Sequence, residues 1–288
     1  MRSSYEGYRV LLVHAHPDDE TINNGATMAM YADLGAQVTL ITCTRGEEGE
    51  ILTPELIHLA SSATDGLGQH REIELANAMQ ALGVKDFRFL AQGETVYRDS
   101  GMMGTEQNNR PDVFWQADLE VASDYLVKVI EEIKPHILIT YDEIGGYGHP
   151  DHIQAHRVAM RASEKSNWKI QKIYWNTMPK SVLAESMAKM KELGSDFFGA
   201  ESVDDLPFAK EDSFVTTLVD GNNYVEAKLA AMKAHHTQIA LDGPFFALSN
   251  NLGLQVWGHE YYTLVKGEKC APFDVSGRES DLFSGVNL

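Results

Sequence analysis

The chain has few cysteines and few basic residues, and it contains no long apolar segment. Cys43 and Cys270 are the only two cysteines among 288 residues, and no CxxC or Cys/His finger spacing is present, which favours a reducing compartment. A net charge of −18 argues against nucleic acid as a partner, because phosphate binding needs a basic surface. The apolar run from Val10 to Val13 is too short for a signal peptide or a membrane span. We therefore expect a cytoplasmic protein with no membrane partner.

Three common ligand-binding and catalytic motifs are also missing. A polar segment, HPDDE, follows the first apolar run where a dinucleotide-binding protein has a glycine-rich turn. No GxSxG or GxxxxGK[ST] segment occurs, which disfavours a serine hydrolase and a P-loop nucleotidase. Internal repeats and proline-rich linkers are absent too, so we expect a single domain.

Short β-branched segments alternate with helical patterns along the first 180 residues. The predicted strands are RVLLVHAH (9–16), QVTLITCT (37–44), DFRFLA (86–91), HILITYD (136–142) and KIYWNTM (172–178). The apolar stripes of two predicted helices are Ala122, Leu126, Val129 and Ile133, and Leu75, Met79 and Leu82 ahead of Gly83, which suits a helix end. This alternation predicts an α/β fold with a Rossmann-like, doubly wound, mostly parallel sheet.

The pattern becomes less regular after about residue 180. A charged helix (181–193), a strand (213–220) and a second helix (222–238) predict a smaller C-terminal α/β subdomain over residues 181–288, behind a Rossmann-like core over residues 1–180. Two polar segments, 45–65 and 92–117, are longer than usual connections, and loops of that length are often functional.

Two polar clusters follow the first and fourth predicted strands. His16 and Asp19 lie in the segment HAHPDDE (14–20), and His152 ends the segment GGYGHPDH (145–152). Ligands of open α/β sheets bind at the carboxyl ends of the strands, and strands 1 and 4 are neighbours in the commonest order. On that order His16, Asp19 and His152 could bind zinc or ferrous iron and leave a fourth position for water. Asp18 would be free for another role.

Several of these residues also have a plain structural interpretation. Asp18 and Asp19 could cap the helix that follows them, and the acidic residues Glu47, Glu48 and Glu50 could form a solvated loop. Residues such as His58, His70 and His136 are more simply read as hydrogen-bonded histidines without chemistry. His156 lies four residues after His152, where it could share a helix face with His152 or point at solvent.

At these two clusters the sequence resembles the LmbE-like, or PIG-L-type, zinc deacetylases of N-acetylglucosaminyl substrates. Their hallmarks, AHPDDE and HPDH, stand here at 15–20 and 149–152. The segments that resemble the mycothiol-biosynthetic branch are NNGAT (23–27), TCTRGEEGE (42–50), YRDSGMMGT (97–105), YDEIGGYGHPDH (141–152), KAHHTQ (233–238) and ALSNNL (247–252). That branch deacetylates N-acetylglucosaminyl-inositol. The related mycothiol S-conjugate amidases usually carry proline where this chain has Gly148 and lack the RDSGMMGT loop, so the deacetylase is favoured.

Position by position, the resemblance implies a role for each site residue. His16, Asp19 and His152 would bind the metal, and Asp18 would be the general base. The Tyr147 hydroxyl and a protonated His149 would stabilise the oxyanion, and either Asp18 or His149 would be the general acid. The positions that match sugar or inositol contacts are Arg71, Asp99 and Glu47. Asp151 could orient His149 or His152, or it could be a surface carboxylate without such a role.

Three hypotheses follow: a deacetylase of a small sugar substrate, a conjugate amidase, and a metal-binding protein without turnover. The third is disfavoured because a structural zinc site normally fills all four positions with protein ligands, whereas this set supplies three beside an additional carboxylate.

Overall fold

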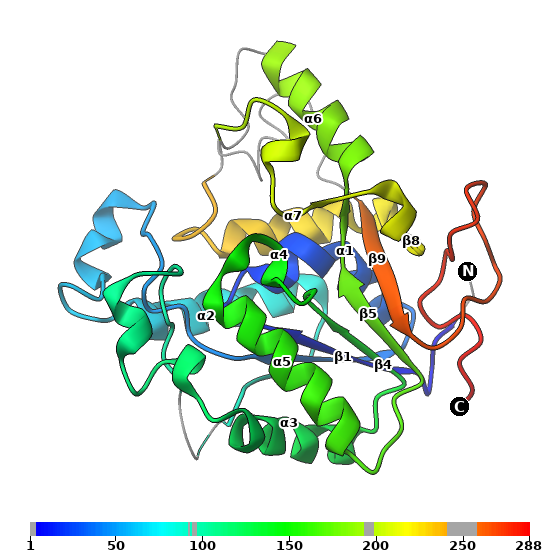
Figure 1. The fold of residues 1–288 in the computed structure, drawn as a ribbon, viewed down its shortest axis with the longest axis horizontal. Helices are drawn as coiled ribbons and strands as arrows, with labels where there is room; N and C mark the ends of the chain where they lie inside the picture. The colour runs from blue at the N-terminus through cyan, green and yellow to red at the C-terminus, as the bar shows by residue number, and fades with distance from the viewer. Residues whose placement is uncertain (1–3, 92, 94–96, 193–198, 241–257) are drawn as a thin grey trace.

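A computed structural model of the protein describes residues 4–91, 93, 97–192, 199–240 and 258–288. These residues form a seven-stranded sheet in the order β3-β2-β1-β4-β5-β9-β8 (Figure 1). The strands are β1 (Arg9–His14), β2 (Gln37–Thr42), β3 (Asp86–Phe89), β4 (Ile137–Thr140), β5 (Lys172–Asn176), β8 (Thr217–Asp220) and β9 (His259–Lys266). Strands β1 to β5 are parallel, whereas β9 runs antiparallel to both β5 and β8. The predicted mostly parallel α/β sheet is confirmed, and β1 and β4 are neighbours as expected.

Helices cover both faces of this sheet (Figure 1). One layer contains α1 (Asp19–Asp33), α2 (Leu67–Leu82) and α7 (Val225–Ala234), and the other contains α3 (Leu119–Ile133) and α5 (Pro150–Lys165). Successive strand side chains point to opposite faces. Accordingly, Val10 and Leu12 of β1 pack with residues of α1 and α2, while Leu11 and Val13 pack with residues of α3 and α5. The sheet is thus buried on both faces, which explains the continuous apolar run in β1.

The two predicted crossover helices are present. Ala122, Leu126 and Ile133 are buried on α3, and Val129 is half-buried beside them. The apolar stripe Leu75, Met79 and Leu82 is buried on α2. Gly83 ends α2 in the left-handed conformation with φ 71, which confirms the predicted helix end.

The chain after β5 begins with a small unit beside the main sheet. In it β6 (Met178–Pro179) pairs with β7 (Ala209–Lys210), and α6 (Lys180–Glu192) packs on them through Leu183 and Met190. The predicted strand over 213–220 is shorter than expected, because its first residues form the 3-10 turn η5 (Asp212–Phe214). The predicted helix over 222–238 is divided into η6 (Asn222–Tyr224) and α7. The division at residue 180 stays a prediction; β8 and β9 extend the main sheet.

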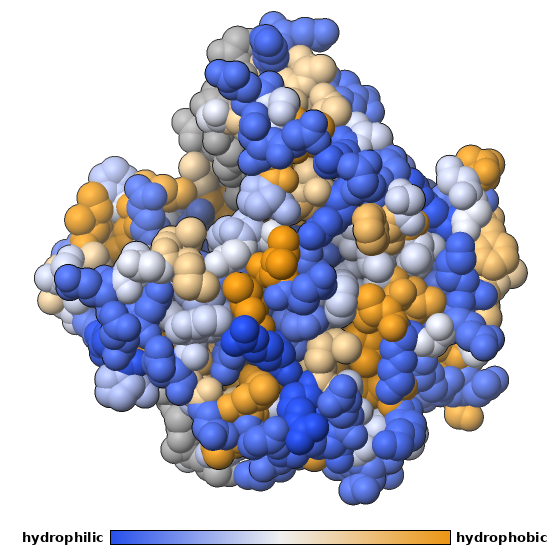
Figure 2. Space-filling view, in the orientation of Figure 1, coloured by the Kyte–Doolittle hydropathy of each residue, from blue (hydrophilic) through white to orange (hydrophobic). Residues whose placement is uncertain are grey.

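The remaining short elements lie mainly in the long connections. They are η1 (Pro54–Leu59), η2 (Glu106–Asn109), η3 (Phe114–Gln116), α4 (Gly145–Gly148) and η4 (Val203–Asp205). Figure 2 shows hydrophilic side chains over most of the visible face, as the acidic composition leads one to expect. Among the described residues, none of the helices combines the length and the apolar character needed to cross a membrane.

Candidate active site

The two polar clusters open into one cavity of about 880 Å³. β1 ends at His14 and α1 begins at Asp19, so the first cluster forms the loop between them. The second cluster follows β4 and leads through α4 into α5. Because β1 and β4 are adjacent and parallel, both loops lie at the same edge of the sheet. The residues of the two clusters that line the cavity are His16, Asp18, Asp19, Gly145, Gly146, Tyr147, His149 and His152.

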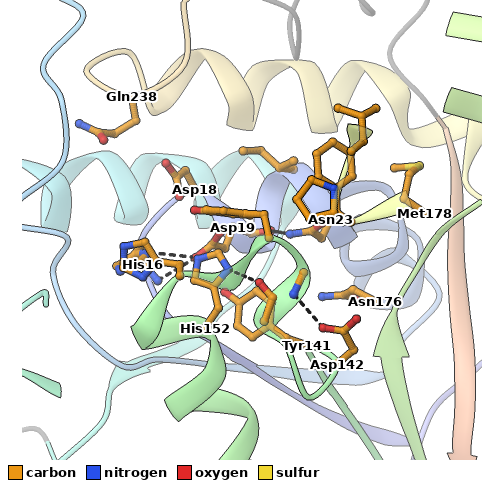
Figure 3. A pocket seen from close by; sticks show the side chains of 18 of the residues that line it. His16, Asp18, Asp19, Asn23, Tyr141, Asp142, His152, Asn176, Met178 and Gln238 are labelled. Atoms are coloured by element: carbon orange, nitrogen blue, oxygen red, sulfur yellow. Dashed lines mark hydrogen bonds and ion pairs between the residues drawn. The ribbon is translucent and has the colours of Figure 1, made fainter. Parts of the chain in front are cut away.

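Three side chains converge at the floor of this cavity, as Figure 3 shows. The Oδ2 atom of Asp19 lies 3.4 Å from Nδ1 of His16 and 3.4 Å from Nε2 of His152. Zinc bonds of about 2.0–2.1 Å at tetrahedral angles give ligand separations of about 3.3 Å. The imidazole of His152 donates through Nδ1 to the Gly145 carbonyl at 3.2 Å, which leaves the lone pair on Nε2. That buried Nε2 has no hydrogen-bond partner among the described residues, so the set fits a divalent metal ion.

His149 is a second candidate ligand. One ligand atom each of His16, His149 and His152 lies within 4.8 Å of the others. However, His149 is the N-cap of α5, and its Nδ1 accepts the backbone N–H of Asp151 at 3.1 Å. The remaining ring proton is therefore on Nε2. Burial, reinforced by His16 and His152, lowers the pKa of His149 to about 3. The lowered pKa and the occupied Nδ1 both favour a neutral imidazole over the protonated one that we expected, with Nε2–H as its donor; the role of His149 in the reaction stays a prediction.

Asp151 orients a different histidine from the two expected. Its Oδ2 lies 3.2 Å from Nε2 of His16 and accepts the backbone N–H of Ser100 at 2.9 Å, while the Ser100 hydroxyl donates to Oδ1. The reason is that His149 precedes α5, whereas Asp151 lies in its first turn with a fully buried carboxylate directed at the β1 loop. The contact orients the His16 ring so that Nδ1 lies towards Asp19, 3.4 Å from its Oδ2.

Asp18 occupies a strained backbone position. Its φ is 125 and its ψ is −35, values that non-glycine residues rarely adopt. Its carboxylate makes no helix-capping hydrogen bond; instead Oδ2 lies 3.2 Å from Nη2 of Arg71. The simple interpretation of Asp18 as a helix cap is therefore wrong. Burial raises the pKa of Asp18 to about 6, although Arg71 opposes that shift.

Tyr147 lies in α4, within the connection between β4 and α5, and lines the cavity. Its ring centroid is 5.0 Å from that of His152 and 6.2 Å from that of His149. Burial, and then the negative charge of Asp19, raises the pKa of Tyr147 well above its ordinary value. The hydroxyl therefore keeps its proton and can donate a hydrogen bond.

The three residues expected to contact the sugar or inositol lie close together but not equally near the cavity. Arg71 and Asp99 are buried and line the cavity, whereas Glu47 lies behind Asp99 and accepts its backbone N–H at 3.0 Å. Asp99 in turn accepts the backbone N–H groups of Gly101 at 2.8 Å and Glu48 at 3.2 Å. Glu47 is 8% exposed, so its interpretation as part of a solvated loop is wrong.

The other histidines have mostly structural contacts. His136 accepts the backbone N–H of Arg9 at 3.1 Å, and His58 donates to the Glu55 carbonyl at 3.1 Å. His156 donates to the Tyr141 carbonyl at 2.9 Å, which turns it away from His152.

Two supports of the site were not anticipated from the sequence. The ring of Tyr141 stacks on His152 with centroids 4.3 Å apart, and its hydroxyl accepts the Ala15 N–H at 2.8 Å. Glu20 accepts the backbone N–H of Asp18 at 2.9 Å and lies 2.9 Å from Nε2 of the buried His235. Glu20 and His235 lie in AHPDDE and KAHHTQ, two of the segments that resemble the family, and this resemblance was the feature of the sequence that could have indicated a role for them.

The comparisons with known proteins agree with this geometry. A family model described as GlcNAc-PI de-N-acetylase (PIG-L) matches residues 11–163, more than half of the chain. The 1D-myo-inositol 2-acetamido-2-deoxy-alpha-D-glucopyranoside deacetylase 1 of Catenulispora acidiphila is 56% identical over 97% of this chain and 90% of that protein. The deacetylase of Geodermatophilus obscurus with the same substrate in its name is 55% identical over 96% of this chain and 98% of that protein. The chain belongs to the PIG-L family of de-N-acetylases. It is therefore an amide hydrolase of a metal-dependent family.

Solved structures share the fold of this de-N-acetylase at low sequence identity. N,N'-diacetylchitobiose deacetylase from Pyrococcus horikoshii superposes with a TM-score of 0.56 and 20% identity, over 90% of this chain and 84% of that one. GalB, the 4-carboxy-2-hydroxymuconate hydratase from Pseudomonas putida, superposes with a TM-score of 0.56 and 17% sequence identity, over 93% of this chain and 100% of that one. One fold thus carries both a deacetylase and a hydratase, so the reaction has to be argued from the site.

Proposed function

We propose that this PIG-L protein hydrolyses the acetamide of 1D-myo-inositol 2-acetamido-2-deoxy-α-D-glucopyranoside to glucosaminyl-inositol and acetate, as a step of mycothiol biosynthesis. The observation that carries the proposal is the convergence of His16, Asp19, His152 and Asp18 at one end of a cavity that Arg71 and Asp99 also line. Relatives that are 51–56% identical over at least 96% of the chain bear the name of this deacetylase, which supports the substrate.

The resident metal is proposed to be zinc, with ferrous iron as the alternative, held by His16, Asp19 and His152. Two imidazoles and a carboxylate suit either ion. When bound, such an ion acts as a Lewis acid toward the acetyl carbonyl and lowers the pKa of water. Free Cys43 and Cys270 are compatible with the proposed cytoplasmic location.

The other residues supply the proton transfers and hydrogen bonds. The Asp18 carboxylate removes a proton from the water that attacks the acetyl carbon. The Tyr147 hydroxyl and the neutral Nε2–H of His149 donate hydrogen bonds to the carbonyl oxygen as it becomes negative, each worth about 10²–10³ in rate. The C–N bond then breaks, and Asp18 gives the proton it took from water to the leaving amine. A carboxyl with a raised pKa can hold that proton in the meantime. His149 is less suited to this step, because its Nδ1 accepts a backbone N–H and its one ring proton, on Nε2, is used to hydrogen-bond the carbonyl oxygen.

Arg71 links the base to the substrate side. Its Nη2 contacts Asp18 and donates to the Pro17 carbonyl, and its Nη1 donates to the Gly46 carbonyl at 2.9 Å. We propose that these contacts hold Arg71 at the cavity wall, where it can also donate to substrate hydroxyls. Asp99 lies on the same wall with carboxylate oxygens that accept hydrogen bonds from hydroxyl groups.

The test compares two amides on the purified, zinc-loaded protein. Acetate release from the inositol glycoside and cleavage of the cysteinyl amide of a mycothiol S-conjugate are measured under the same conditions. We expect the first kcat/KM to exceed the second by at least tenfold, because the loop over residues 97–105 and Gly148 match the deacetylase pattern. Faster cleavage of the conjugate would instead assign the chain to the amidases.

A further inference from the structure

A second group of metal-binding side chains lies outside the active-site cavity. His70 and Glu74 stand one turn apart on α2, and His236 follows α7 by two residues. One ligand atom of each lies within 4.8 Å of the other two. The carboxylate Oε1 of Glu74 is 3.6 Å from Nε2 of His70 and 3.0 Å from Nδ1 of His236, separations close to those between ligands of one zinc ion.

The carboxylate at the centre of this group is buried and held in place. Glu74 is 2% exposed. Its Oε1 accepts the backbone N–H of Thr237 at 2.9 Å, and its Oε2 accepts the Thr237 hydroxyl at 2.8 Å. Metal-bound carboxylates are usually fixed by such outer hydrogen bonds, and each oxygen retains a second lone pair.

A buried carboxylate needs a positive partner, since an unpaired charge away from water is costly. Among the described residues, the basic groups within 4.0 Å of Glu74 are the imidazoles of His70 and His236. Nε2 of His70 is itself buried and has no hydrogen-bond partner in the described part of the chain. A cation between the three side chains would satisfy both the Glu74 charge and this nitrogen.

We propose that His70, Glu74 and His236 bind a second zinc ion, with water at the fourth position. The His236 side chain is 48% exposed, so an ion can reach the group from solvent. Exposure also means that His236 must be immobilised on binding, which makes this site weaker than the buried one in the cavity. Binding converts any protonated imidazole to its neutral form and releases that proton to solvent.

The second ion would tie α2 to the chain that follows α7. Each of the two connected segments also contributes a residue to the active-site cavity. Arg71, which follows His70, lines the cavity, and so does Gln238, two residues after His236. Figure 3 shows Gln238 on the side of the cavity beyond Asp18. The proposal does not depend on the substrate of the enzyme, since it concerns only metal binding.

The experiment counts zinc ions on the full chain. Chelator-stripped protein is dialysed against a series of buffered free zinc concentrations, and bound zinc is measured by atomic emission. We expect two equivalents, a tight one that His152→Ala removes and a weaker one that His236→Ala and His70→Gln remove. His58→Ala is the matched control, because the His58 imidazole hydrogen-bonds a neighbouring backbone carbonyl rather than a carboxylate and its loss should leave both equivalents.

The proposal is overturned if the wild-type chain saturates at one equivalent, or if His236→Ala still binds two. Loss of the weaker equivalent in His58→Ala as well would mean general binding to surface histidines, which also overturns it. His236 is half exposed, so His236→Ala is expected to fold, and circular dichroism checks this. In crystals soaked with zinc, an anomalous peak between His70 Nε2, Glu74 and His236 Nδ1 is the expected result, and its absence at saturating zinc counts against the site.

Discussion

Gly145 stands where the loop after β4 passes closest to His152, and replacing it with alanine tests what positions this ligand. The residue has φ 64, and a Cβ atom there would lie 2.6 Å from Cβ of His152 and 2.8 Å from the backbone nitrogen of Ile153. The carbonyl of Gly145 also accepts the Nδ1 proton of His152. Gly146 serves as the control, because its φ of 72 is also positive, whereas among the described residues beyond its own stretch of chain no atom lies within 4 Å of the added Cβ.

The two substitutions share the strain of a positive φ and differ in whether the added Cβ overlaps other atoms. Backbone strain at a positive φ costs about 1–3 kcal/mol, so both variants lose that much stability. The overlap with His152 and Ile153 adds about 1–3 kcal/mol for Gly145→Ala alone, because the contacted atoms are backbone or Cβ and cannot rotate away. Ligand distances in a metal site tolerate only about 0.2 Å, so Gly145→Ala should also weaken zinc binding.

Urea denaturation of the chelated proteins and zinc competition with a chromophoric chelator measure the two effects separately. We expect Gly145→Ala to lose at least tenfold in zinc affinity while Gly146→Ala keeps the wild-type value. Equal losses of stability together with equal zinc affinity would refute the reasoning, since close approach of the loop would then not be what holds His152.

The other predictions concern the proposed chemistry. Chelation should abolish acetate release, and added zinc or ferrous ion should restore it; full activity in a preparation shown to be metal-free would contradict the metal assignment. Asp18→Asn should keep its metal but lose about 10²–10⁴ in kcat, whereas His152→Ala should lose metal as well as rate. Steady-state kinetics together with metal analysis distinguishes the two variants. A near-native kcat for Asp18→Asn would show that Asp18 is not the general base. Asp99→Ala should lower kcat/KM for the inositol glycoside far more than for N-acetylglucosamine, because the inositol ring supplies binding energy that positions the acetamide; equal losses on the two substrates would remove Asp99 from inositol recognition.

The sequence predicted the meeting of His16, Asp19 and His152 because it depends on few variables. An apolar run with β-branched residues that ends in a polar, proline-containing segment places that segment at the carboxyl end of a strand. Two such segments come together whenever the strands that precede them are adjacent and parallel, as β1 and β4 are. The apolar stripes on α2 and α3 were equally readable, because a period of 3.6 residues is a local property.

Side-chain directions inside the site were not readable in this way. Asp151 contacts His16, which lies 135 positions away in the chain, and also accepts the N–H of Ser100, which lies 51 positions away. The Nδ1 atom of His149 accepts a backbone N–H of α5, a geometry that exists only once the helix has formed. Glu47 is buried behind Asp99 because two loops pack on each other, and no periodic pattern in either loop signals that packing.

The support of Asp18 extends into the C-terminal part of the chain. His235 follows α7, is separated from Glu20 by 215 positions, and lies fully buried 2.9 Å from its Oε1. Burial opposes ionisation of both groups, whereas the Glu20 charge raises the pKa of His235 and the His235 charge lowers the pKa of Glu20, so each group favours the charged form of the other. Glu20 in turn accepts the N–H of Asp18, whose φ of 125 persists only because its surroundings enforce it. A chain lacking α7 and His235 would bury the Glu20 carboxylate without this imidazole, and the acceptor of the Asp18 N–H would lose a contact that fixes its position.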